Sequence, residues 1–119
     1  ADAEQLKQVF LNIILNAVEA MSQNPPERSR TLIISIEKGA SIDDHSHYLL
    51  LSFEDSGKGI SEKDLDHIFN PFFTTKDEGT GLGLAICYGI INRHEGEIEV
   101  HSTPGKGTCF TIKLPQYIV

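Results

Sequence analysis

The sequence predicts one mixed domain of helices and strands, and three observations support this. Helical and strand-like hydrophobic patterns alternate along the 119 residues, which is typical of an α/β or α+β class. Hydrophobic residues make up 39% of the chain, enough for a single core. No linker, internal repeat or low-complexity tract divides the sequence, so we expect residues 1–119 to form one domain.

The charge and the cysteines narrow the possible partners and the compartment. The formal net charge is −7, whereas a nucleic acid would require basic patches. We expect Cys87 and Cys109 to be reduced core residues of a cytoplasmic domain, because each lies in an apolar pattern. No apolar run has membrane-spanning length and no signal peptide is visible. We therefore expect no direct membrane contact by this domain, although a longer parent protein could be membrane-anchored.

Residues 2–22 are predicted to form one long helix. The opposite sides of this helix are both apolar, and Leu11, Leu15 and Val18 form much of the second side. A helix that is apolar on both sides is expected to be largely buried. The first, broader apolar side contains Leu6, Val9, Phe10, Ile13, Ala17, Ala20 and Met21.

A narrow polar strip separates the two apolar sides and contains Gln5, Gln8, Asn12, Asn16 and Glu19. Asn12 and Asn16 lie one turn apart, so their amide groups point to the same place. Amide oxygens suit a hard cation such as Mg²⁺, which also shares the phosphate oxygens of a nucleotide. The alternative is that both asparagines hydrogen-bond to neighbouring backbone, and the helix alone does not decide between the two.

Two strands are predicted next, at residues 31–38 and 48–54. The polar segment 39–47 joins them as a hairpin. His45 and His47 in this segment have the spacing of metal ligands, but a loop rich in Asp and Ser argues against a metal site.

The second strand leads into an acidic residue and two glycines, Asp55, Gly57 and Gly59. This pattern fixes a carboxylate beside a backbone that a ligand can approach closely. An ionised carboxylate only accepts hydrogen bonds, so Asp55 suits the exocyclic amino group of adenine. The alternative is an ordinary turn that Asp55 caps.

A glycine-rich stretch precedes the second long helix, which is predicted over residues 82–94. Gly79, Gly81 and Gly83 occupy alternate positions before or at the start of this helix. Free N–H groups and the helix dipole make such a place suitable for a phosphate. Residues 72–78 would form a short flap over it. The alternative is a glycine-rich turn before a core helix.

The remaining elements are a short helix and two strands. The short helix spans residues 61–69, with Ser61 as its N-cap. Gly96 is expected to end the second long helix. The two strands are predicted at residues 97–102 and 108–114, joined by a turn.

Five motifs now stand in one order along the chain. They are Asn12-x-x-x-Asn16-Ala17, Asp55-x-Gly57-x-Gly59, Phe69-x-Pro71-Phe72-Phe73, Gly79-x-Gly81-x-Gly83, and Gly107-Thr108-x-Phe110 with Leu114-Pro115. Together they resemble the ATP-binding catalytic domain of sensor histidine kinases, in the superfamily that also holds gyrase and the heat-shock chaperone and mismatch-repair ATPases. Each motif alone is weak, but the ordered set is specific and covers nearly the whole chain.

The resemblance implies a fold as well as a family. It implies an α/β two-layer sandwich in which a mixed, largely antiparallel sheet packs against helices, known as the Bergerat-type ATP-binding fold. It also implies an N-terminally truncated domain, because a strand and a helix commonly precede the asparagine helix. The dimerisation helix with the phospho-acceptor histidine is expected outside this sequence.

The resemblance further implies ATP and Mg²⁺ as ligands and assigns roles to residues. Asn16 would be the principal Mg²⁺ ligand with Asn12 alongside, and Lys76 would contact the γ-phosphate; these three are the expected catalytic residues. Asp55 would read adenine and Thr108 would support the adenine end. The other residues expected at the nucleotide are Gly57, Gly59, Ile60, Phe69, Phe73, Thr74, Thr75, Gly79, Thr80, Gly81, Leu82, Gly83 and Leu84.

Three functions remain open at this point. The favoured one is a kinase module of two-component signalling, which passes the γ-phosphate to a histidine on a separate dimerisation domain and then to a response regulator. A relative that hydrolyses ATP would carry a glutamate in place of Asn12, and an amide cannot accept the proton of the attacking water. The third is a nucleotide-binding module without transfer activity, which Asp55 and the intact glycines disfavour.

Overall fold

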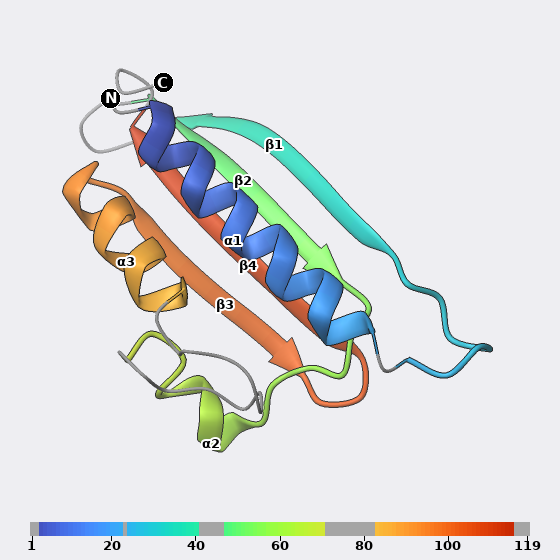
Figure 1. The fold of residues 1–119 in the computed structure, drawn as a ribbon. Coiled ribbons are helices and arrows are strands. Elements are labelled where there is room, and N and C mark those ends of the chain that lie inside the picture. The colour runs from blue at the N-terminus through green and yellow to red at the C-terminus, as the bar shows by residue number, and fades with distance from the viewer. Residues whose placement is uncertain (1–2, 23, 41–46, 71–82, 116–119) are drawn as a thin grey trace.

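The structure is a computed structural model, and it describes residues 3–22, 24–40, 47–70 and 83–115. Helices and strands alternate along it (Figure 1). The mixed α/β class is therefore confirmed. The elements are, in order, α1 (Ala3–Met21), β1 (Leu32–Ala40), β2 (His47–Asp55), α2 (Glu62–Leu65), α3 (Gly83–Arg93), β3 (Glu97–Thr103) and β4 (Gly107–Pro115).

The four described strands form one sheet in the order β1-β2-β4-β3, and every neighbouring pair is antiparallel. α1 and α3 lie side by side on one face of this sheet (Figure 1). Side chains alternate across a strand, so Phe110, Ile112 and Leu114 of β4 are buried under the helices. Ser52 and Thr111, which pair across β2 and β4, face the other side. The result is the predicted two-layer sandwich.

The core lies between the sheet and the two helices. On α1 it uses the broad apolar side predicted from the helical wheel, since these residues recur every three or four positions. Across the part of the chain that the structure describes, no helix has the length and apolar character needed to cross a membrane. The buried core comprises Leu6, Val9, Ile13, Leu51, Phe53, Ile68, Cys87, Ile90, Ile91, Phe110, Ile112 and Leu114.

The second apolar side of α1 is exposed, so the prediction of a largely buried helix is wrong. Leu11, Leu15 and Val18 are 56%, 50% and 53% exposed. The helix packs on the sheet with one face and beside α3, and no described element covers the rest. Ile34 and Ile36 of the edge strand β1 are also exposed, at 49% and 66%. Helical periodicity identified the residues that share a face but not which faces have a neighbour.

The end of α3 also differs from the prediction. The helix ends at Arg93, and Glu95 rather than Gly96 has a left-handed backbone, with φ of 59°. The N–H of Gly96 donates to the carbonyl of Ile91 at 2.9 Å. A Cβ on Gly96 would lie 2.6 Å from the carbonyl oxygen of Lys113. Gly96 is therefore needed for close packing against β4, while Glu95 makes the turn.

The short helix α2 begins where the sequence predicts but ends earlier. Ser61 caps α2 as predicted, because its hydroxyl accepts the N–H of Asp64 at 3.2 Å. α2 ends at Leu65, and turns continue the chain where a helix to residue 69 was expected.

Both cysteines are free, but only Cys87 is a core residue. Cys109 is half-buried, and it alternates with buried residues of β4, so its side chain lies on the open face of the sheet.

Candidate functional site

The candidate site begins at Asp55, the last residue of β2, which is only 7% exposed. The N–H of Gly57 donates to its Oδ1 at 2.8 Å, and the backbone of Thr108 donates a second hydrogen bond. Burial raises the pKa of Asp55 above the usual range of an aspartate. Those two hydrogen bonds and the charge of Arg28 partly offset the rise in pKa, and Glu54 adds to it. A ligand that donates a hydrogen bond would stabilise this buried carboxylate.

The two glycines after Asp55 are required by the protein's own packing. A Cβ on Gly57 would lie 2.8 Å from the backbone and the Cβ of Ala20 in α1. Gly59 has φ of 77°, and its Cβ would run into the carbonyl oxygen of Thr103 and lie 2.9 Å from Cα of Pro104. The turn that contains Gly57 and Gly59 thus packs closely between the end of α1 and the β3–β4 connection.

We expect Gly59→Ala to destabilise the domain much more than Gly105→Ala. Both glycines have similar left-handed backbones, with φ of 77° and 81°, but no atom of the described residues lies within 4 Å of a Cβ on Gly105. The left-handed conformation costs about 1–2 kcal/mol in each variant. The clash adds about 1–3 kcal/mol for Gly59 alone. Urea denaturation measures both, and equal losses would show that the close approach is unimportant.

Ser102 ties this turn to the β3–β4 hairpin. Its Oγ accepts the N–H of Ile60 at 2.7 Å and donates to the carbonyl of Gly107 at 2.9 Å. Because a serine has one hydroxyl hydrogen, Thr108 must donate in the 2.8 Å hydrogen bond between the two hydroxyls. Thr108 is 5% exposed and pairs with Asp55 across β4 and β2. The predicted residues Ile60 and Thr108 are therefore joined through Ser102, which the sequence analysis missed.

Asn12 of α1 is hydrogen-bonded to a thiol of α3. Its Nδ2 donates to Sγ of Cys87 at 3.7 Å, and the thiol donates to the carbonyl of Val9 at 3.8 Å. Burial raises the pKa of Cys87, so the thiol keeps its hydrogen and can only accept from Asn12. This fixes the orientation of the amide, so that its oxygen is directed away from the thiol.

The chemistry of this strip fits a hard cation. Asn16 lies one turn beyond Asn12 on α1 and is half-buried. Among the described residues, no cluster of three or more His, Cys, Asp or Glu side chains could hold a metal ion. His47 is exposed at the start of β2, and His45 lies outside the described residues. A cation at this strip would therefore rely on amide oxygens, water and the ligand's phosphates, the set that Mg²⁺ accepts.

The N-terminus of α3 lies close to Asn12. The helix begins at Gly83, one residue after the predicted start, and Cys87 follows one turn later, roughly 6 Å along the axis. No described atom lies within 4 Å of a Cβ on Gly83. The N–H groups of the first turn of α3 suit an anion. The predicted residues outside the described ranges are Phe73, Thr74, Thr75, Lys76, Gly79, Thr80, Gly81 and Leu82.

Phe69 connects the segment after α2 to α3. Its ring lies 5.3 Å from the ring of Tyr88, with 36° between their planes. Phe69 and Leu84 are half-buried and both pack against the core. This contact holds the chain beside α3 at Phe69, and the predicted flap, residues 72–78, lies outside the described residues.

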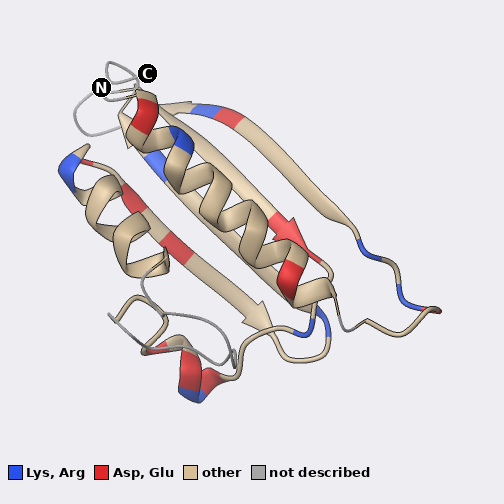
Figure 2. Ribbon diagram, viewed as in Figure 1, with Lys and Arg blue, Asp and Glu red and all other residues tan. Residues whose placement is uncertain are grey.

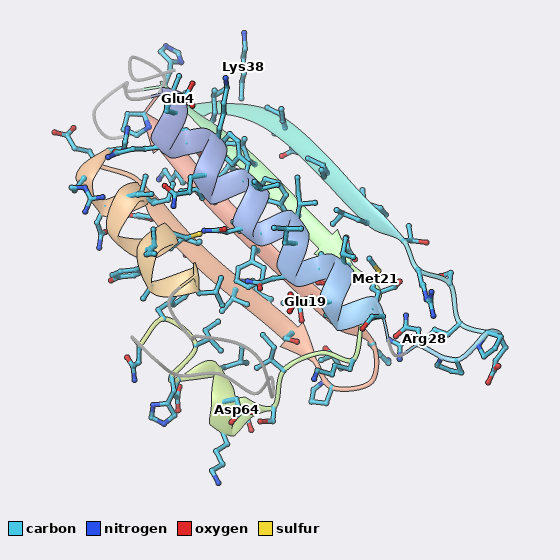
Figure 3. All side chains as sticks on the ribbon, in the orientation of Figure 1. Glu4, Glu19, Met21, Arg28, Lys38 and Asp64 are labelled. Carbon is cyan, nitrogen blue, oxygen red and sulfur yellow. The ribbon has the colours of Figure 1, made fainter. Side chains whose placement is uncertain are left out.

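α1 links the two ends of the site. At its C-terminal end, the carbonyl of Ala20 accepts the N–H of Lys58 in the turn after Asp55, at 3.3 Å. Asn12 lies roughly 12 Å back along the helix, beside α3. The turn after Asp55 thus lies at the C-terminal end of α1, and Asn12 lies further toward the N-terminal end of the same helix. Figure 3 shows Glu19 and Met21 at the C-terminal end of this helix.

Comparison with known proteins identifies the family of this chain. The family model of histidine kinase-, DNA gyrase B- and HSP90-like ATPases matches residues 1–118. The sensor histidine kinase ZraS of Escherichia coli strain K12 is 46% identical over 118 residues, which cover 97% of this chain. The chain spans only 22% of the length of ZraS.

Solved structures of histidine kinases have a similar fold. Full-length ShkA, solved in complex with AMPPNP, gives a TM-score of 0.73 at 30% identity, and the match covers 97% of this chain and 22% of ShkA. The catalytic domain of histidine kinase ThkA gives a TM-score of 0.75 at 37% identity, and the match covers 97% of this chain and 68% of that domain. The chain belongs to the histidine kinase-, DNA gyrase B- and HSP90-like ATPase family, and within it to the histidine kinase catalytic domains.

Proposed function

We propose that this domain binds Mg-ATP and donates the γ-phosphate to a histidine on a separate dimerisation domain of the same parent protein. A response regulator would then take the phosphate from that histidine. The similarity to sensor histidine kinases supports this, and so does the ATP analogue in the related ShkA structure. The two free cysteines fit a reducing compartment, so the proposal places the domain in the cytoplasm.

The observation that carries the nucleotide assignment is the buried carboxylate of Asp55. Two backbone N–H groups hold it at the end of β2, although burial disfavours its charge. Such a group is stabilised by a donor, and the exocyclic amino group of adenine is one. Guanine would present a carbonyl oxygen to the same carboxylate. Lys and Arg are scattered over the described elements (Figure 2). Without a basic patch on these elements, this distribution argues against a nucleic acid as the binding partner.

We propose that Asn12, Asn16 and the start of α3 form the part of the site that binds the phosphates and their metal ion. The two asparagines would hold Mg²⁺, which neutralises phosphate charge when bound. Lys76 and the glycines before α3 would contact the phosphates. Asn12 also supports transfer over hydrolysis, because an amide cannot act as a general base for water.

Asn16→Ala should remove the Mg²⁺-dependent part of ATP binding, weakening binding in Mg²⁺ by at least about tenfold. The helix should remain stable, because alanine is the better helix former. Calorimetric titration of ATP with and without Mg²⁺ measures the effect. Gln8→Ala, an exposed position on the same strip, is the matched control. Parallel loss of stability and binding, with no Mg²⁺ dependence in the wild type, would contradict the metal assignment.

A further inference from the structure

The loop that follows α1 is hydrogen-bonded to the turn after Asp55, and Asn24 is the first residue of the loop to contact it. Asn24 is 7% exposed, and its Nδ2 donates to the carbonyls of Ser56 at 2.9 Å and Ser29 at 3.0 Å. The carbonyl of Ser56 and the N–H of Gly57 belong to one planar peptide group. That N–H is the one that donates to Oδ1 of Asp55. By holding the carbonyl, Asn24 fixes the direction of the N–H that orients the carboxylate.

Arg28 holds the next peptide group in the same way. Its Nη2 donates to the carbonyl of Gly57 at 2.6 Å. The N–H of Lys58, on the other side of this peptide group, donates to the carbonyl of Ala20 at 3.3 Å. Figure 3 shows Arg28 near the C-terminal end of α1, marked by Met21. The Ser56–Gly57 and Gly57–Lys58 peptide groups are therefore each held at both ends.

We infer that Asn24 and Arg28 are positioning residues that determine base specificity. They fix the two peptide groups of the turn, so that the Gly57 N–H holds the Asp55 carboxylate in the orientation that accepts from adenine and rejects guanine. This inference rests on the proposed function. The charge of Arg28 acts in the same direction, because it favours the ionised carboxylate.

A purely structural role would give a different result. If the loop only stabilised the fold, its loss would lower the melting temperature and weaken ATP and GTP binding equally. If it positions Asp55, its loss should weaken ATP binding and leave GTP binding nearly unchanged. The ratio of the two dissociation constants therefore separates the two roles.

The test is calorimetric titration of ATP and of GTP, each with Mg²⁺, into the 119-residue chain and its variants. Arg28→Met and Asn24→Ala should each lower the preference for ATP about tenfold, the loss of roughly one hydrogen bond. Arg28→Lys, which keeps a charged donor, should restore most of the preference. Arg30→Met is the matched control, because Arg30 contacts the carbonyls of Ser22 and Asn24 at 3.3 Å instead of the turn.

The outcomes separate this inference from the proposed function. An unchanged preference in Arg28→Met and Asn24→Ala, in a wild type that prefers ATP, would overturn the inference alone. If Asn24→Ala does not fold, Arg28→Met decides, because Arg28 is only half-buried. A wild type that binds no Mg-ATP would overturn the proposed function and this inference with it.

Discussion

Asp55→Asn is expected to weaken ATP binding by at least about tenfold and to remove the preference for ATP over GTP. The carboxylate would lose its charge-assisted hydrogen bond from the adenine amino group, worth about 1.5–3 kcal/mol. The amide nitrogen of asparagine can also donate to the carbonyl oxygen of guanine, which a carboxylate cannot do. Glu54→Gln removes a neighbouring exposed carboxylate and should change neither affinity. Equal affinity of the wild type for both nucleotides would refute the role of Asp55.

The same substitution should change how stability depends on pH. Burial raises the pKa of Asp55 in the folded protein above its ordinary value of 3.8, so folding favours the protonated carboxyl. Its contribution to stability is full below the ordinary pKa and is lost as pH rises through the folded-state pKa. Asparagine does not titrate. The melting temperature of the variant should therefore gain on that of the wild type between about pH 4 and neutrality. A melting temperature of the variant that falls relative to that of the wild type over this range would contradict the direction of the pKa shift.

The second large effect concerns what the chain does alone with ATP. We expect neither appreciable hydrolysis nor self-phosphorylation. Asn12 cannot activate water, and Glu19 lies on the same strip roughly 10 Å away at 1.5 Å per residue. The chain has five histidines, and none lies in a matching acceptor motif. His94 is buried, with Nδ1 2.8 Å from the carbonyl of Ile90.

Local patterns predicted most of the fold. Alternation placed the strands within one or two residues, and Ser61 was identified as a cap because capping involves only neighbouring residues. The exposure of Leu11, Leu15 and Val18 was not predictable, since it depends on which elements lie beside α1. The left-handed turn at Glu95 was missed for a related reason. Gly96 is explained by its contact with β4, which is distant in sequence.

The site divides in the same way. Asp55, Gly57 and Gly59 could be proposed as one candidate turn from the sequence alone, because strand, carboxylate and turn are contiguous there. Asn24, Arg28 and Ser102 could not, because each acts on a residue between 5 and 42 positions away through a hydrogen bond to backbone. The contact between Asn12 and Cys87 spans 75 positions. Only the packing of α1, α3 and the sheet brings these residues together.

The most direct test of the proposed function is incubation of the chain with γ-labelled ATP and Mg²⁺, alone and with the proposed dimerisation domain that would carry the acceptor histidine. We expect acid-labile phosphohistidine on that partner, formed only when both are present. Asn16→Ala should reduce it at least about tenfold, in line with the loss of metal-dependent binding. Robust phosphate release by the chain alone, abolished by Asn12→Ala, would refute the kinase proposal and identify an ATPase instead.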